Sequence, residues 1–107
     1  MIELVWQDET EEYGYYRASV TVASGDASDY VKTNYNTQPT VAVYPSGRCY
    51  VEYTLSTPAV IDAGNAEWIK WPIGNTRRNA ADTVVGVVSA VRLVSITGAA
   101  TMEVLSK

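Results

Sequence analysis

The sequence lacks histidine and phenylalanine, and it has one cysteine among its 107 residues. Without histidine the chain has neither Ser-His-Asp nor Cys-His catalysis, and no histidine-ligated zinc or haem. Because Cys49 is alone, it forms no disulfide within the chain and no cysteine-rich metal site. We therefore predict a protein that is not an enzyme, with no catalytic residues, no cofactor and no metal, whose fold is stabilised by packing.

Positive charge and long apolar runs are also scarce. Eight Lys and Arg face twelve Asp and Glu, which gives a net charge of −4 and no basic stripe, so nucleic acid is not expected as a partner. Arg92 interrupts the longest apolar run before it reaches the roughly eighteen residues that span a bilayer, so no membrane association is expected. Met1 leads directly into Ile-Glu-Leu-Val-Trp, which predicts synthesis in the cytoplasm without a signal peptide.

Residues that favour strands are abundant, with 15 Val, 5 Ile and 11 Thr. Hydrophobic residues make up 47% and charged residues 19%, which is typical of a globular protein, and the length suits one domain over 1–107. We predict an all-β fold, an antiparallel β-sandwich or small barrel of about seven to eight strands with at most one short helix. Ser28 or Asp29 could cap that helix, near 29–36.

Alternating apolar residues between Gly and Pro turn signals mark the individual strands. The strands predicted in this way cover 2–6, 16–22, 41–44, 49–55, 66–71, 83–96 and 101–105, with 59–61 as a resumption of the preceding strand. The simplest pairings are two antiparallel hairpins, 41–44 with 49–55 and 88–96 with 100–105. Polar loops are expected at 8–12, whose carboxylates lack the spacing of a calcium loop, and at 75–82.

The inward side of each strand supplies a candidate core. It consists of Leu4, Val20, Val22, Val41, Val43, Val51, Tyr53, Trp68, Val91, Leu93, Met102 and Val104. Cys49 shares a side with Val51, so we interpret it as a small buried apolar residue and not as a reactive thiol. Trp6 is expected in the core or at its rim.

Eight Tyr and three Trp are many for a chain of this length. These side chains combine an apolar body with a hydrogen-bonding tip, which suits interfaces. Arg77 and Arg78, in a predicted loop, suit either a solvated tip or two anchors for an acidic patch on a partner. The candidate partner contacts are Tyr13, Tyr15, Tyr35, Arg77 and Arg78.

Three segments between Pro45 and Leu105 carry a resemblance to a known group of proteins. They are PSGRCYVEYTLSTPA, AGNAEWIKWPIG and VSAVRLVSITGAATMEVL. Their order resembles small β-rich virion proteins of tailed bacteriophages. The resemblance implies a β-sandwich in the virion, made in the host cytoplasm, that decorates or cements the capsid by binding the major capsid protein or another virion protein. A neck or tail component is an alternative, and no catalytic motif is carried over.

A carbohydrate-binding module is a further alternative, because β-sandwiches can stack Tyr or Trp rings on sugars. Such a site needs two or three exposed aromatic rings along one face. Trp68 and Trp71 are three residues apart, so an ideal strand directs them to opposite sides. This spacing argues against a shared platform, and a glycan partner is the weaker hypothesis.

The ends of the chain favour a homo-oligomer, a dimer or trimer joined through strand edges or a Tyr-rich patch. The segments 1–6 and 101–105 carry few charges and no Pro, so neither is protected as an edge strand. We expect Val5 and Leu105 on outer faces at this contact. The alternative is a monomer whose edges are shielded by the loops at 8–12 and 75–82.

Overall fold

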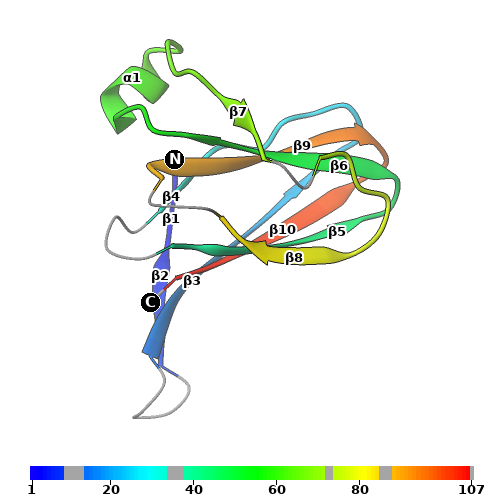
Figure 1. Ribbon diagram of the computed structural model, residues 1–107, viewed down its shortest axis with the longest axis horizontal. Helices are drawn as coiled ribbons and strands as arrows, with labels where there is room; N and C mark the ends of the chain where they lie inside the picture. Colours follow the sequence, from blue (N-terminus) through cyan, green and yellow to red (C-terminus); the bar gives the residue numbers. More distant parts are fainter. Residues whose placement is uncertain (9–13, 34–37, 72–73, 85–87, 107) are drawn as a thin grey trace.

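A computed structural model of the protein describes residues 1–8, 14–33, 38–71, 74–84 and 88–106. In this part of the chain two five-stranded sheets face each other, as Figure 1 shows. The first sheet has the order β1 (Ile2–Glu3), β4 (Val31–Lys32), β9 (Ala90–Thr97), β6 (Arg48–Thr54) and β7 (Ile69–Lys70). The second has the order β2 (Val5–Asp8), β3 (Gly14–Val22), β10 (Ala100–Ser106), β5 (Thr40–Pro45) and β8 (Ala80–Thr83).

The predicted antiparallel β-sandwich is confirmed, since among the described pairings only β1 with β4 is parallel. The strand number is higher than predicted, with ten strands in the described residues. The predicted strand at 2–6 is divided into β1 and β2, β8 lies chiefly in a predicted loop, and β4, with only two residues, lies where no strand was predicted. Such short strands show no alternation, so a sequence pattern does not reveal them.

The core lies between the two sheets and is built from the alternate residues of long strands. Most of the predicted core is fully buried there, including Val41, Val51, Leu93 and Met102. Three predicted residues, Leu4, Val20 and Tyr53, are partly buried and pack against this core. Trp71, which was not predicted, is buried in it, and Cys49 is buried as expected.

Both predicted hairpins are wrong, because each joins strands of different sheets. β5 and β10 belong to the second sheet, whereas β6 and β9 belong to the first. The two turns that cross between the sheets lie side by side, with Ser46 N donating to the Ala99 carbonyl at 2.8 Å. Alternation identifies the buried side of a strand, but strands of either sheet bury the same kind of side chain, so it does not assign the sheet.

The short helix α1 (Pro58–Asp62) lies where a resumed strand was predicted at 59–61. Thr57 caps it, with its side chain accepting from Val60 N, and Pro58 suits the first helical turn. The predicted helical turn at 29–36 is wrong in its described part, which contains β4. Residues 34–37 lie outside the described residues.

Three other predicted segments differ from the structure. The strand at 66–71 is reduced to β7, and β8 occupies the end of the predicted 75–82 loop. The last strand of the 83–96 stretch begins at Ala90, with 85–87 outside the described residues. β10 lies in the middle of its sheet between β3 and β5, so the prediction of an unprotected edge is wrong for 101–105.

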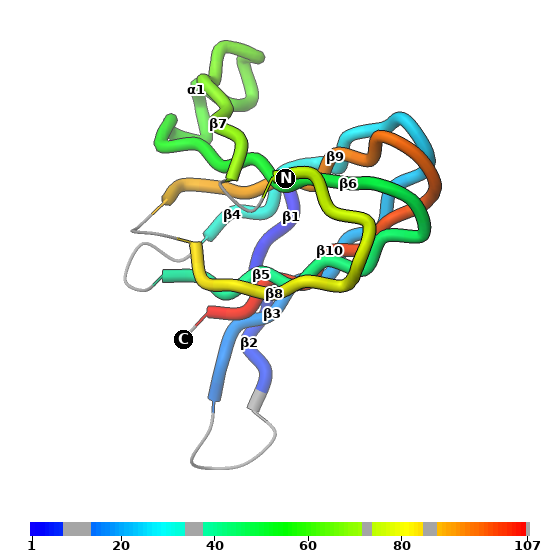
Figure 2. Tube along the Cα trace, turned by 45° about the vertical axis from the view of Figure 1, so that its right-hand side comes forward, coloured from blue at the N-terminus to red at the C-terminus, as the bar shows by residue number. Residues whose placement is uncertain are grey.

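The N-terminal segment does lie at sheet edges, because β1 ends the first sheet and β2 ends the second. Figures 1 and 2 show the β2–β3 hairpin projecting beyond the other strands, while α1 lies at the opposite side of the molecule. In the described residues no helix has the length and hydrophobicity needed to span a bilayer.

Candidate functional site

A groove of about 520 Å³ is lined by residues of the first sheet and of the segment that contains α1. Figure 1 shows α1 beside that sheet. The sheet contributes its floor, and the segment containing α1 folds over it because a second, smaller apolar cluster forms beneath. That cluster buries Tyr30, Ile61 and Ala90, with Trp68 packed against them. The groove is lined chiefly by Asp29, Tyr30, Ile61, Asp62, Trp68 and Arg92.

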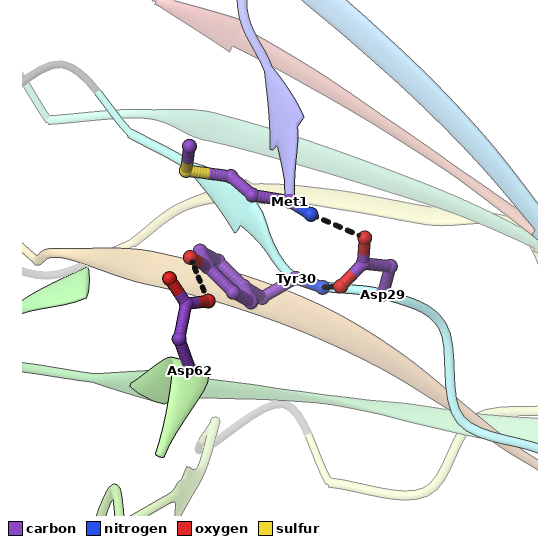
Figure 3. A network of polar contacts seen from close by, with 4 residues as sticks. All are labelled: Met1, Asp29, Tyr30 and Asp62. Atoms are coloured by element: carbon purple, nitrogen blue, oxygen red, sulfur yellow. Dashed lines mark hydrogen bonds and ion pairs between the residues drawn. The ribbon is translucent and has the colours of Figure 1, made fainter. Parts of the chain in front are cut away.

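Tyr30 connects the sheet to α1 at the base of this groove. Its side chain is 6% exposed, and its hydroxyl donates to Asp62 Oδ1 at 2.8 Å, as Figure 3 shows. Burial, together with this hydrogen bond to a carboxylate, raises the pKa of Tyr30 to about 12. The phenol therefore stays protonated at neutral pH and holds the last residue of α1 on the sheet.

Asp29 forms the other polar contacts shown in Figure 3. Its Oδ1 accepts from Tyr30 N at 3.0 Å, and its Oδ2 pairs with the Met1 α-ammonium group at 2.6 Å. The hydrogen bond from the ammonium group to Asp29 raises the pKa of that group. Asp29 and Tyr30 thus bring β1, β4 and α1 together at one end of the groove.

Arg92 covers the indole of Trp68, with its guanidinium carbon 4.2 Å from the ring centroid. The same guanidinium pairs with Glu52 Oε1, at 2.9 Å from Nε and 2.8 Å from Nη2. Nearby on this sheet, Lys70 Nζ lies 4.3 Å from the centroid of the Tyr50 ring. Both cation–aromatic contacts join side chains of the protein to one another, and neither supplies a nucleophile or a general base.

The interior of the sandwich offers a different environment, because apolar side chains fill it. Val43, Leu93, Met102 and Val104 are at most 1% exposed. Burial raises the pKa of the Cys49 thiol, which opposes formation of a reactive thiolate. Within the described ranges no three His, Cys, Asp or Glu side chains gather into a metal-binding group.

The structure does not bring the predicted partner contacts into one patch. Tyr13 and Tyr35 lie outside the described residues. Tyr15 is half-buried in β3 of the second sheet, opposite Gln7. Arg77 and Arg78 are exposed in a turn that pairs with the first sheet. In that turn the Thr76 hydroxyl donates to the Arg78 carbonyl at 2.9 Å and accepts from Arg78 N at 3.2 Å.

Exposed apolar side chains lie on β2 and on β10 of the second sheet. Val5 and Leu105 are 58% and 42% exposed and flank Arg17 in the register, in agreement with the predicted outer positions. Trp6, expected in the core or at its rim, is 51% exposed and meets Tyr16 edge-on at 5.0 Å. The chain changes sheets at Leu4, which carries Trp6 onto the projecting hairpin.

Sequence reasoning missed the groove because distant segments make it. Tyr30 and Asp62 are 32 positions apart, and no local pattern indicates that they meet. The sequence around Asp62, Asp-Ala-Gly-Asn, signalled only a turn. The Thr57-Pro58 pair was the available sign of α1, since Thr is a good N-cap and Pro a good first helical residue.

Comparisons with known proteins reveal similarity in structure alone. No family model and no curated protein matches the sequence. An oxalate oxidase superposes on 85% of this chain with a TM-score of 0.53 and 16% identity, and the match spans only 40% of that protein. The Schizosaccharomyces pombe Cnp3 cupin domain superposes on 97% of this chain and 63% of its own, with a TM-score of 0.50 and 9% identity. The sandwich therefore has a cupin-like jelly-roll fold, a fold that an enzyme also uses.

Proposed function

We propose that this protein is a non-enzymatic structural component of a tailed-bacteriophage virion and works by binding other virion proteins. The observation that carries the proposal is the exposed Trp6 on the projecting β2–β3 hairpin. A large exposed aromatic ring on a projecting hairpin is typical of a protein-binding surface. Within the described residues the ring meets Tyr16 edge-on and packs over Gly14, where an added Cβ would overlap Trp6 Cζ2, and Trp6 remains 51% exposed.

The edge position of β2 strengthens this argument. β2 pairs with β3 on one side, and it is the last strand of its sheet on the other. An edge strand with exposed apolar residues readily accepts another chain. The hairpin therefore offers both backbone hydrogen-bonding groups and the Trp6 ring to a partner.

Two further observations support a structural role in a virion. In the described residues apolar side chains, among them Val51, Leu93 and Met102, pack together between the two sheets, which suits a structural domain. The stretch that resembles phage virion proteins, Pro45 to Leu105, runs from the end of β5 through β10, so it includes the middle strand of each sheet, β9 and β10, and also the edge strands β7 and β8. We propose the major capsid protein as the partner, with a neck or tail protein as the alternative location.

Particles produced with and without this gene product provide the test. We expect mass spectrometry to find the protein in purified particles and cryo-electron microscopy to show density that disappears when the gene is deleted. The position of this density distinguishes capsid decoration from a neck or tail location. A protein that stays in the lysate supernatant while particles are complete would contradict the proposal.

A matched pair of variants tests the role of the hairpin. Trp6→Ser is expected to lower incorporation into particles at least about tenfold, since a central aromatic contact is commonly worth 2 kcal/mol or more. Leu55→Ser is the control, because Leu55 is 65% exposed but follows β6 in the other sheet. Equal loss in both variants would argue against a contact made by the hairpin.

The groove favours a second candidate function, binding of a carbohydrate. Trp68, Asp62 and Arg92 line it together, which combines an aromatic ring, one face of which Arg92 covers, with hydrogen-bonding groups. It has no extended aromatic platform, because Trp71 is 4% exposed and lies in the main core, away from the cluster of Trp68. A glycan array bound by the wild-type protein but not by Trp68→Ala would support this candidate, and an array without hits would remove it.

A further inference from the structure

Four basic side chains gather around the beginning of β6, and we call this group the basic ridge. It consists of Arg48, Lys70, Arg77 and Arg78. An antiparallel bridge holds it together, in which Cys49 N donates to the Thr76 carbonyl at 3.0 Å and Thr76 N to the Cys49 carbonyl at 2.8 Å. This bridge places Arg48 and Arg77 at adjacent positions on neighbouring strands.

The direction of these side chains follows from strand geometry. Cys49 and Val51 are fully buried, and neighbouring residues of a strand point to opposite sides, so Tyr50 lies on the outer side. Arg48 is half-buried at the start of β6, where the register with β9 shifts between Arg48 and Cys49. Lys70 lies over the Tyr50 ring at 4.3 Å, and Arg77 and Arg78 are exposed. The ridge thus continues from the turn at 76–78 onto the outer face of the first sheet.

Within the described residues no ion pair joins the ridge to a carboxylate; Glu52 lies opposite Lys70 in the register but pairs with Arg92. The ion pairs found there join Arg17 to Glu103, Arg92 to Glu52, and the Met1 ammonium group to Asp29. Like charges at facing strand positions are destabilising, and this chain has more carboxylates than cations to pair with them. Arg77 and Arg78 are exposed and form no ion pair in the described residues, so they are available to carboxylates of another molecule.

We infer that the basic ridge docks onto a carboxylate-rich surface of a protein partner in the particle. This inference rests on the proposed function and adds the charge of the partner to it. Arginine binds carboxylates through two parallel hydrogen bonds, and Arg and Tyr are enriched at the energetic centres of interfaces. Tyr50, under Lys70, contributes the aromatic part of that combination.

Nucleic acid fits the basic ridge less well than a carboxylate-rich protein surface does. The net charge of −4 repels a polyanion at distances beyond the ridge. Proteins that bind single strands stack bases on free aromatic rings, whereas Lys70 covers the ring of Tyr50. A protein surface with clustered carboxylates needs only local contacts, so it fits a group of four cations.

The test uses particles purified from a deletion mutant, to which the intact protein is added back. Three single variants, Arg77→Glu, Arg78→Glu and Lys32→Glu, change the net charge equally, and Lys32 lies in β4 away from the Cys49–Thr76 bridge. Binding is measured by co-sedimentation over a range of salt concentrations. We expect Arg77→Glu and Arg78→Glu each to weaken binding at least about tenfold and to reduce its salt dependence, with Lys32→Glu within about twofold of wild type.

The outcomes separate this inference from the proposed function. Particle binding by wild type that neither arginine variant weakens would overturn the inference and leave the virion role standing. Wild-type protein that binds no particles would overturn the proposed function itself. Two results would show that the ridge binds a different partner. One is tight, ridge-dependent binding of a single-stranded oligonucleotide. The other is salt-sensitive self-association in sedimentation velocity that Arg77→Glu abolishes.

Discussion

At the scale of single residues, Tyr30 gives the protein a defined response to alkaline pH. Its pKa is about 12 in the folded chain and 10.0 ordinarily, so folding favours the protonated phenol. The resulting stabilisation is complete below pH 10 and is lost as the pH rises from 10 through 12. We expect the free energy of unfolding to fall over this interval in wild type and to fall less in Tyr30→Phe.

Urea unfolding at a series of pH values measures this difference. Spectroscopic titration of tyrosinate gives an independent reading, because Tyr30→Phe should remove the component that titrates near pH 12. Tyr50→Phe is the control, since Tyr50 contacts Lys70 and lies outside the groove. An identical alkaline loss of stability in Tyr30→Phe and wild type would contradict the assigned role of the Tyr30–Asp62 contact.

Arg48 and Arg77 lie at adjacent positions beside the Cys49–Thr76 bridge, which leads to a second prediction at the residue scale. A substitution of Arg77 that weakens binding to the partner should raise the stability of the fold. Arg77→Glu replaces a repulsive cross-strand pair with an attractive one next to Arg48. We expect the free energy of unfolding to rise by about 0.2–1 kcal/mol, the usual range for such pairs. Thermal unfolding of Arg77→Glu and Lys32→Glu measures it, and a clear loss of stability in Arg77→Glu alone would show that the two arginines do not repel.

At the scale of elements, the turn between β5 and β6 depends on close contact with the end of β9. A Cβ added at Gly47 would overlap the backbone carbonyl of Thr97. The backbone at Thr97 cannot easily move away from the added atom, so we expect Gly47→Ala to lower the free energy of unfolding by more than about 2 kcal/mol. Chemical denaturation checks this expectation.

Gly25→Ala is the appropriate comparison for that turn. Its Cβ would have open space, but its φ of 80° is strained for alanine. The cost there is expected to be about 1–2 kcal/mol from the backbone alone. If Gly47→Ala proved milder than Gly25→Ala, the close packing of the two sheet-crossing turns would be in doubt.

The sequence predicted which side of each long strand is buried, but it did not predict to which sheet each strand belongs. Alternation located the buried sides of β5, β6, β9 and β10, because burial on one side leaves a period of two. It did not assign these strands to sheets, since the pairing depends on contacts between distant segments. The same limit applies to the site: Arg77 and Arg78 were predicted as a pair, whereas the proximity of Arg48 depends on the Cys49–Thr76 bridge.

At the scale of the whole molecule, the edges of the two sheets bear on self-association. β1 and β2 are consecutive in the chain and end different sheets, so one short segment provides both edges on that side. The outer face of the second sheet carries Val5 and Leu105 on either side of Arg17. Arg17 pairs with Glu103, with Nε 3.1 Å from Oε2, so the charge of Arg17 between Val5 and Leu105 is neutralised.

A face of this kind, next to an open edge, is suited to a second copy related by a symmetry axis. We therefore expect a dimer or trimer at micromolar concentration, measured by sedimentation velocity, and a single species near 11.7 kDa would contradict it. Val5→Asp and Leu105→Asp should dissociate the oligomer while circular dichroism stays that of the folded protein, because both side chains are exposed in one chain. Leu55→Asp places the same charge beyond the other sheet and should leave the oligomer intact. Dissociation by all three variants alike would point to net charge and not to this face as the cause.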